Sequence, residues 1–475
     1  MNQRFWIPVL FFLVIFLSLS GPGMLMAEDA PAGSGFSLDD ILSGFDDTVA
    51  PSKSPAAEEA APVQRSWDLS GYLKLSTIFN INHDAPAIGQ TDYRGLSRMR
   101  TELNLELETA LSDSWNLKVT GRAFHDFAYN IKGRYNYTSQ VLSDYEDEAE
   151  FRETYIEGRV LPSLDLKVGR QIVVWGNSET FRVTDMLNPL DNRDPGLVDI
   201  EDLRLPVCMA KASYYVGNWS IAAIAIPEMR FDKQPVYGND FFPFAQPLPD
   251  DHIPAETPGN TEFAVSARGE FHGWDLSLYG ARLFDDQSHY ETIGTRNMGG
   301  VLVPIFKREH SRITMAGCSA NVATGNWLLK TELAFTDGHQ FNRTTDKKSR
   351  VKGLVGFEYS GLTDTTLTLE FVHTHMFHYE PVMGLLPDYE VEDQFEADFR
   401  VTRSMLNDRL NIVFLALARG GRAQDGAFER LTADYDINDY VTATIGCVFY
   451  QDGENPLYDN IHDNNRVFFN LKYSF

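Results

Sequence analysis

The most distinctive charged stretch of this 475-residue sequence runs from residue 169 to residue 206, where arginines alternate with carboxylates. A connection of about 30 residues is longer than a simple connector, and long ordered loops usually carry function. The oppositely charged side chains of this stretch can form ion pairs and hydrogen bonds with one another, and these contacts can hold the stretch in a folded conformation. The candidate residues are Arg170, Trp175, Glu179, Arg182, Asp185, Asn188, Asp191, Glu201, Asp202 and Arg204.

Two groups of side chains could bind a metal ion, although neither has a complete ligand spacing. His373 and His375 would project from one face of a strand. The carboxylates between residues 191 and 202 offer the oxygen ligands that calcium prefers, but the EF-hand spacing is absent. Arg193 and Arg204 can neutralise those carboxylates instead. We therefore expect no bound metal and keep the two histidines as candidates.

The sequence contains no recognised catalytic motif. It has no G-x-S-x-G nucleophile elbow, no phosphate-binding glycine loop and no paired-cysteine zinc site. It has three cysteines, Cys208, Cys318 and Cys447, which are far apart in the sequence. Their odd number excludes a fully paired disulfide framework, and we interpret them as small apolar side chains on strands. We expect neither an enzyme nor a cofactor. The alternative is a catalytic cluster assembled in space, such as one that acts on lipid at a membrane rim.

The elements that must position these residues are strands, because from Trp67 onward the side chains alternate with a period of two. Leucines alternate with polar residues over residues 102–108, and residues 394–402 and 466–475 follow the same pattern. Lipid on one face and a polar lumen on the other produce this alternation in a membrane β-barrel. Only every second side chain then faces lipid, which agrees with the low mean hydropathy of −0.27.

Tight turns and long polar loops alternate along the expected strands. The turns are expected near Ser112, Pro162, Gly217, Gly273, Gly325, Gly361, Asn407 and Asn438. Short turns belong to the periplasmic side of such barrels, and an even strand number keeps both termini there. We therefore predict an all-β fold over residues 66–475. It is a transmembrane antiparallel up-and-down barrel of about 18 strands, with about 16 as the alternative.

A barrel of that width leaves an aqueous channel unless something fills it. We expect the loop over residues 176–206 to fold into the lumen as a constriction, the alternative being an external loop held flat on the rim. Carboxylates along a channel favour cations, but neighbouring arginines oppose them, so a weak cation preference is expected. The predicted lumen wall comprises Arg98, Arg100, Glu102, Glu106, Glu108, Glu396, Asp398, Arg400 and Lys472.

The two ends of the chain indicate its destination. Arg4 precedes an apolar run that a Gly-Pro-Gly break ends before it reaches the length of a membrane anchor. Residues 1–27 therefore have the order of a secretory signal peptide, and we expect cleavage after Ala27 and export to a Gram-negative outer membrane. The last strand ends on Tyr473-Ser474-Phe475, which resembles the C-terminal signature that the barrel-assembly machinery recognises.

Residues 28–65 form an acidic tail, with eight acidic residues against two basic ones. Such a composition cannot bury enough apolar surface to fold alone. Residues 37–46 show a short helical pattern that could dock a periplasmic partner or the barrel mouth, or be a transient turn in a linker. The net charge of −26 argues against nucleic acid as a partner, and outer-membrane lipid is the expected surrounding.

The charged stretch contains several short motifs, which are Gly169-Arg170-Gln171, Trp175-Gly176, Asp185 with Asn188-Pro189, and the acidic-Arg-Pro element from Glu201 to Pro206. These motifs resemble those of the outer-membrane proteins grouped as the domain of unknown function 1302 family. The resemblance runs less specifically from about Trp67 to the end and does not cover the tail. It implies an outer-membrane porin-like barrel, and it supplies no substrate and no catalytic residue.

The sequence therefore favours an outer-membrane channel or facilitated-diffusion porin for small solutes, constricted by the loop over residues 176–206. The alternative is an outer-membrane component of an export route, or of a route for lipids and hydrophobic compounds, that docks a periplasmic partner through the tail. A closed lumen would favour export. A continuous apolar stripe along the lumen would favour hydrophobic compounds.

Overall fold

The computed structural model describes residues 67–87, 90–198, 200–299, 301–454, 458–459 and 461–475. The expected signal peptide, its cleavage after Ala27, the acidic tail and the short helix over residues 37–46 lie outside the described residues. No helix in the described ranges is long and apolar enough to cross a membrane.

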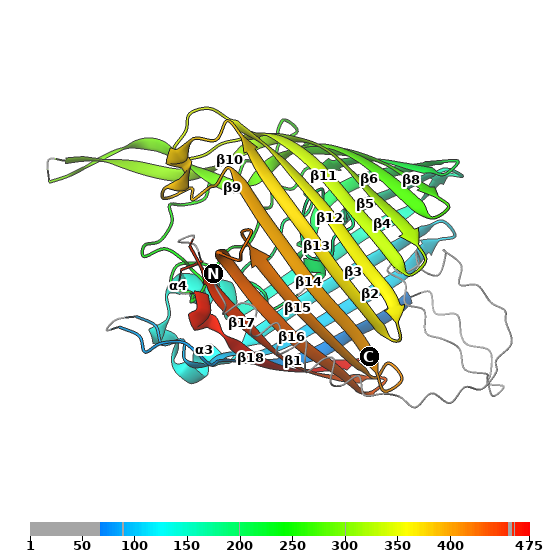
Figure 1. Ribbon diagram of the computed structural model, residues 1–475, viewed down its shortest axis with the longest axis horizontal. Helices are drawn as coiled ribbons and strands as arrows, with labels where there is room; N and C mark the ends of the chain where they lie inside the picture. Colours follow the sequence, from blue (N-terminus) through cyan, green and yellow to red (C-terminus); the bar gives the residue numbers. More distant parts are fainter. Residues whose placement is uncertain (1–66, 88–89, 199, 300, 455–457, 460) are drawn as a thin grey trace.

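The described chain forms one sheet of eighteen strands (Figure 1). The first nine are β1 (Trp67–Asn80), β2 (Gly95–Ser112), β3 (Trp115–Asp126), β4 (Asp147–Leu161), β5 (Leu164–Gln171), β6 (Val207–Val216), β7 (Trp219–Ile226), β8 (Glu262–Phe271) and β9 (Trp274–Met298). The other nine are β10 (Val301–Thr324), β11 (Trp327–His339), β12 (Lys348–Leu362), β13 (Thr365–Phe377), β14 (Asp393–Met405), β15 (Leu410–Arg419), β16 (Asp425–Asn438), β17 (Val441–Gly453) and β18 (Arg466–Ser474).

The helices among the described residues are short and lie in the connections between strands. They are α3 (Ala128–Lys132), η2 (Arg134–Asn136), α4 (Ser139–Tyr145), α5 (Ile200–Leu203), η3 (Pro381–Gly384) and η5 (Ile461–Asn464).

The sheet closes because each strand pairs antiparallel with the next and the last pairs with the first. The closing register aligns Tyr72 with Ser474. The backbone N–H groups of Gly71 and Phe475 each donate to the other residue's carbonyl oxygen at 3.0 Å. Closure leaves the wall without an unpaired edge, as a sheet surrounded by lipid requires. The predicted up-and-down barrel is confirmed.

All of the predicted tight turns join neighbouring strands at one end of the barrel, the turn end. They connect β2 to β3, β4 to β5, β6 to β7, β8 to β9, β10 to β11, β12 to β13, β14 to β15 and β16 to β17. The remaining connections, most of them longer, lie at the opposite end, the loop end. The predicted number of about 18 strands is confirmed, and the alternative of about 16 is excluded.

Side-chain exposure follows the predicted alternation. On β1, Leu73 and Leu75 are exposed, while Lys74 and Ser76 are more shielded. Four strands that follow a tight turn begin with a tryptophan, which suits the membrane interface at the turn end. These residues are Trp115, Trp219, Trp274 and Trp327.

Strand lengths differ around the wall. The strands β5, β6, β7 and β8 have 8, 10, 8 and 10 residues, whereas β9 and β10 have 25 and 24. The outer part of the β9–β10 pair projects beyond the barrel as a two-stranded ribbon (Figure 1). The wall is formed by its shortest strands over β5 to β8, and the long connections from β5 to β6 and from β7 to β8 begin there.

Candidate functional site

Residues 172–206, which connect β5 to β6, form what we call the inward segment, because its buried side chains contact the inner wall. The predicted loop began at residue 176, which implied a strand as far as Trp175, but β5 ends at Gln171. The backbone N–H of Val173 donates to the side chain of Asn188 at 2.8 Å, not to a neighbouring strand. The strand prediction was wrong at this end because side chains within the segment replace the sheet partner.

One side of the inward segment packs on an apolar part of the inner wall. Trp175 and Leu187 lie in a buried cluster, and Trp175 stacks on Tyr279 of β9 with 4.7 Å between ring centroids. The wall residues of this cluster come from β6 to β10 and are Val207, Met209, Ile224, Ile226, Ala264, Ala281, Leu283, Ile313 and Met315. A second cluster joins Phe181 and Val183 to β11, β12 and β13. Burial of this apolar surface favours the inward position.

The carboxylate of Glu332 on β11 is a polar anchor on the same side. It is buried and accepts the backbone N–H groups of Asn177 at 2.6 Å and Ser178 at 3.0 Å. It also accepts the backbone N–H and the hydroxyl of Thr184, at 3.2 and 2.9 Å. Gly176 lies against this carboxylate with a φ of +83°, and an added Cβ would meet Glu332 Oε2 at 2.5 Å. Both conformation and space therefore require glycine.

The predicted residues Glu179, Asp398 and Arg400 come together beside this anchor. Glu179 lies 3.0 Å from Arg400 on β14 and 3.4 Å from Lys330 on β11. The hydroxyl of Thr180 donates to Asp398. A loop carboxylate thus lies between two wall cations, and a wall carboxylate accepts a loop hydroxyl.

Asp185 and Asn188 hold the two ends of the inward segment together. The side-chain amide of Asn188 donates to the carbonyl oxygens of Gln171 at 3.1 Å and Leu205 at 3.0 Å. The carboxylate of Asp185 pairs with Arg204 at 2.9 Å. Several residues of the family-like motifs therefore form the point at which the segment closes on itself.

The middle of the inward segment reaches the wall opposite the apolar clusters. Leu197 packs on buried residues of β1, β17 and β18, which are Ile78, Val448 and Phe468. Asp194 pairs with Arg98 of β2. Burial alone would raise the pKa of the Asp194 carboxyl group, but Arg98 and Arg100 outweigh burial and hold that pKa at about 2. Asp194 therefore stays ionised at neutral pH.

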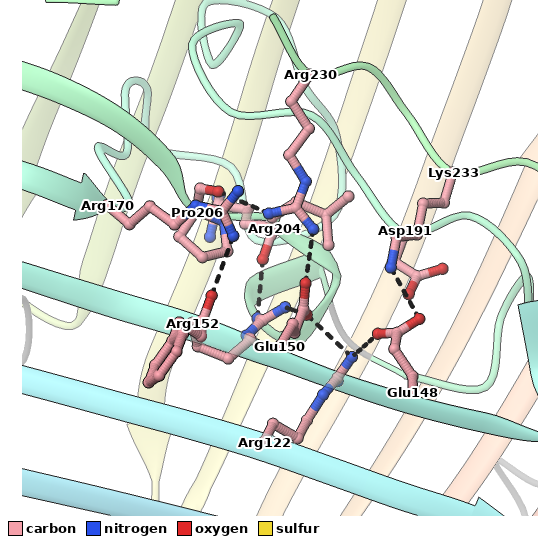
Figure 2. A network of polar contacts seen from close by, with 12 residues as sticks. Arg122, Glu148, Glu150, Arg152, Arg170, Asp191, Arg204, Pro206, Arg230 and Lys233 are labelled. Atoms are coloured by element: carbon pink, nitrogen blue, oxygen red, sulfur yellow. Dashed lines mark hydrogen bonds and ion pairs between the residues drawn. The ribbon is translucent and has the colours of Figure 1, made fainter. Parts of the chain in front are cut away.

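A network of charged groups lies between β3, β4 and the ends of the inward segment (Figure 2). Glu148 on β4 is surrounded by three cations, one of them from the inward segment. These cations are Arg122, Arg193 and Lys233, at 3.0, 2.9 and 2.9 Å. One carboxylate thus joins the wall, the inward segment and the connection between β7 and β8.

Glu150 has the same role two residues further along β4 (Figure 2). Its carboxylate lies 3.3 Å from Arg152 and 2.8 Å from Arg230. The same two arginines donate to carbonyl oxygens of the inward segment, Arg152 to Arg204 at 3.0 Å and Arg230 to Pro206 at 2.8 Å. The last residues of the segment are therefore fixed by charged groups.

Arg170 is the predicted loop residue that lies elsewhere. It is on β5, on the same face as the exposed Val168, and it pairs with Glu228 from the connection between β7 and β8. Because side chains alternate along a strand, Gln171 points inward and Arg170 points outward. Its assignment to the constriction is corrected.

The other loop candidates lie within the inward segment. Arg182 donates to the backbone carbonyl of Asn188 at 2.7 Å, and Asp191 pairs with Arg193 at 2.6 Å. Asp202 is exposed. Glu201 belongs to the short helix α5, and its side chain lies outside the described part of the structure.

The predicted wall residues other than Lys472 line the interior beside oppositely charged or hydroxyl groups. The partners of the carboxylates are Tyr72 for Glu102, Lys118 for Glu106 and Glu108, and Arg419 for Glu396. Arg98 and Arg100 lie 3.8 and 3.6 Å from Asp126. Lys472 lies opposite Lys74 in the β1–β18 register.

His373 and His375 share the outward face of β13. Both contact one oxygen of Asp393, at 2.8 and 2.9 Å. Within the described residues, no group of three or more histidine, cysteine or acidic side chains is arranged to hold a metal ion.

Sequence reasoning missed the wall carboxylates Glu148, Glu150 and Glu332 and the cations Arg230 and Lys233. The three glutamates occupy inward positions on β4 and β11, where side chains alternate between the two faces, so a search for inward charges on every strand could have found them. Arg230 and Lys233 lie in the connection between β7 and β8, where no period marks the direction of a side chain.

Residues 24–475 match the profile of a family described as protein of unknown function (DUF1302). The match includes the tail, so the limit that the sequence motifs suggested at about Trp67 was too narrow. No curated protein matches the sequence.

Solved barrels are similar to this chain in fold. OccAB1 from Acinetobacter baumannii has a TM-score of 0.50 and 9% identity, over 86% of this chain and 96% of that chain. OccAB3 from the same organism has a TM-score of 0.48 and 12% identity, over 86% and 99%. OmpT, an outer membrane protein of Vibrio cholerae, has a TM-score of 0.40 and 11% identity, over 87% of this chain and 100% of that chain. At such identities, the likeness to OccAB1 shows a shared fold alone.

Proposed function

We propose that this chain, which belongs to the outer-membrane β-barrel family described as protein of unknown function DUF1302, is a channel for small solutes that the inward segment narrows. The family description assigns no activity, so the proposal rests on the site. The inward segment is the structural feature that would set the width of the passage.

The observation that carries the proposal is that the inward segment touches opposite parts of the wall. Trp175 packs toward β6 to β10, whereas Leu197 packs on β1, β17 and β18. An eighteen-stranded barrel is too wide for its own wall side chains to fill and otherwise leaves an aqueous channel. A segment that reaches between opposite parts of the wall occupies part of the cross-section of the lumen, so a solute can pass only through the remaining part.

We expect weak selectivity for cations over anions. Carboxylates along a passage favour cations. Here, however, Glu106 lies 3.0 Å from Lys118, and Glu396 lies 3.0 Å from Arg419. Paired charges of opposite sign largely cancel beyond their immediate surroundings, so the remaining field is small.

Single-channel conductance in planar lipid bilayers tests the proposal. The mature chain, expected to begin at Glu28, is compared with a variant in which a short Gly-Ser linker replaces residues 177–203. Unchanged strand content by circular dichroism shows that the barrel still forms. A higher conductance of the variant supports the proposal. Equal conductance of the two proteins would contradict the narrowing role of the inward segment. The absence of conductance from both proteins would contradict the channel function.

A variant that lacks residues 28–65 is the control, because it removes 38 residues that precede β1, whereas the linker replaces 27 residues of the inward segment. A rise in its conductance would make the tail a second closing element. Binding of a periplasmic partner through the tail, assembly through Phe475 and the absence of enzymatic activity stay predictions. The buried apolar wall residues of these two clusters, on β6 to β13, pack against the inward segment, which argues against the alternative route for hydrophobic compounds.

A further inference from the structure

Two arginines point outward from β9 and β10 at the upper limit of the apolar surface. Arg282 lies between Ala281 and Leu283, which are buried in the inner cluster around Trp175. Arg312 precedes Ile313 of the same cluster. Because successive side chains of a strand point to opposite faces, Arg282 and Arg312 face the lipid side of the wall.

The strand register makes the two arginines neighbours. Arg282 is opposite Thr314, and Arg312 is opposite Phe284. They are therefore diagonal neighbours on one face of the β9–β10 pair, a position in which the Cα atoms of two residues on adjacent strands lie about 7–8 Å apart. Two side chains of this length can reach one group from two sides.

Among the described residues, neither arginine forms a hydrogen bond or an ion pair with a carboxylate. Arg312 lies over the ring of Phe284, with 4.2 Å from Cζ to the centroid, and donates to the carbonyl oxygen of Gly259 at 2.9 Å. Arg282 is exposed, and the described part of the chain provides it with no hydrogen bond or ion pair. The guanidinium of Arg282 is thus available to a ligand.

The carboxylates closest along the sheet are engaged elsewhere. Asp337 on β11, opposite Thr314 in the register, accepts the hydroxyl of Ser349 at 2.6 Å. Glu262 on β8 accepts the backbone N–H of Phe284 at 2.5 Å. Neither forms an ion pair with Arg282 or Arg312 within the described residues, although Glu262 and Arg312 lie close enough for their charges to interact.

Several other outward basic or imidazole groups at the loop end differ in this respect, because a carboxylate lies beside each of them. These pairs are Arg170 with Glu228, His125 with Asp147, and His373 and His375 with Asp393. The arginine pair is therefore a local excess of positive charge, not a general property of the rim.

The height of the pair matches the boundary of the membrane. Below it, the outward side chains of β8 and β9 are apolar, including the exposed Val265, Trp274 and Leu278. Arg282 lies eight residues beyond Trp274, which corresponds to about 19 Å along the membrane normal in a strand tilted by about 45°. The apolar band of such barrels is about 25 Å tall. The extended guanidinium groups therefore reach the level of the outer lipid headgroups.

We propose that Arg282 and Arg312 bind a phosphate group of an outer-leaflet glycolipid of the lipid A type. A guanidinium matches phosphate oxygens with two parallel N–H donors, and two guanidinium groups can share one phosphate. The exposed ring of Phe263, opposite Arg282 in the register, and the ring of Phe284 provide apolar surface for the adjoining lipid chains. This site is on the outside of the barrel and does not depend on the channel function.

Native mass spectrometry of the full mature protein in detergent tests this site. The probes are diphosphorylated lipid A, the same lipid without phosphates, and inorganic phosphate as a competitor. The test variant is the double substitution Arg282→Gln and Arg312→Gln. Its control is Arg268→Gln, which removes an arginine near the turn end of β8 that is paired with Glu270 at 3.3 Å.

The wild type and the Arg268→Gln control are expected to bind diphosphorylated lipid A at least about tenfold more tightly than the double variant, as loss of charge-assisted hydrogen bonds implies. The lipid without phosphates should bind all three proteins equally weakly. Equal affinity of the double variant and the wild type for lipid A overturns the proposal. Displacement of the lipid by inorganic phosphate overturns it as well, because the pair would then be a site for a free anion.

Discussion

The two sides of the inward segment are held by different forces. Toward β6 to β13, Trp175, Phe181 and Val183 are buried in apolar clusters. Toward β3 and β4, the contacts are ion pairs around Glu148 and Glu150. Apolar burial depends little on salt, whereas partly exposed ion pairs weaken as salt is raised. We infer that the apolar side fixes the segment on β6 to β13 and that the ion pairs determine how tightly the segment is held toward β3 and β4.

The largest effect is expected for Trp175→Ala. This substitution removes a buried aromatic side chain and its stack on Tyr279, which typically costs about 3–5 kcal/mol. The inward segment should leave the apolar wall, so that conductance rises and the protein unfolds at lower denaturant concentration. Trp327→Ala at the exposed turn end is the control and should leave conductance unchanged. Normal conductance of Trp175→Ala would contradict the fixing role of the apolar side.

A smaller effect on the same side is expected for Gly176→Ala. The new Cβ would meet Glu332 Oε2 at 2.5 Å at a φ of +83°, and such strain costs about 1–3 kcal/mol. Denaturant unfolding should show the loss, and conductance recordings should show brief openings. Gly421→Ala, at a position with nothing within 4 Å of the new Cβ, is the control. If both substitutions behave alike, the close approach at Glu332 is not needed.

On the charged side, Glu148→Gln should have an effect that depends on salt. The substitution leaves Arg193 and Lys233 without a carboxylate that lies 2.9 Å from each, at a cost of about 1–3 kcal/mol. Conductance noise should rise at low salt, and the difference from wild type should shrink at about 1 M salt, where the Debye length is about 3 Å. Glu291→Gln on the projecting ribbon removes an exposed partner of Lys307 and is the control. A difference of equal size at both salt concentrations would argue against an electrostatic role.

The smallest effect is expected for mild acid. Since the pKa of Asp194 lies at about 2, below its usual value of 3.8, its pairing with Arg98 stabilises the fold above the usual value and is lost as the pH falls through about 2. Because Asp194 stays ionised between pH 7 and pH 4, its titration should not change the conductance over this range. Asp194→Asn should reproduce at pH 7 the state that wild type reaches only near pH 2. Opening of the wild type between pH 7 and pH 4 that this substitution abolishes would refute the assignment.

Local patterns in the sequence were sufficient for the wall of the barrel. The alternation around residues 102–108 and the turn residues such as Gly217 and Asn407 each act over a few neighbouring residues, so they could be interpreted without knowledge of the rest of the chain. The strand count and the pairing of successive strands followed from them.

The path of the inward segment was only partly predictable. Its charge and length marked it as important, but the end of β5 at Gln171 and the outward direction of Arg170 depend on contacts with other strands. The missed anchor Glu332 accepts a hydrogen bond from Asn177, which is 155 positions away in the sequence. No pattern in either stretch identifies the other as its partner.

The sequence by itself determined that the chain alternates as membrane strands, where it turns and which long connection carries the charges, because those properties come from local backbone geometry and composition. Only the tertiary structure decided which wall residues hold the inward segment and which arginines face lipid. Closure of the sheet brings β11 and β4 to opposite sides of one segment, and the choice between apolar packing and ion pairing is made by whatever side chains closure places there.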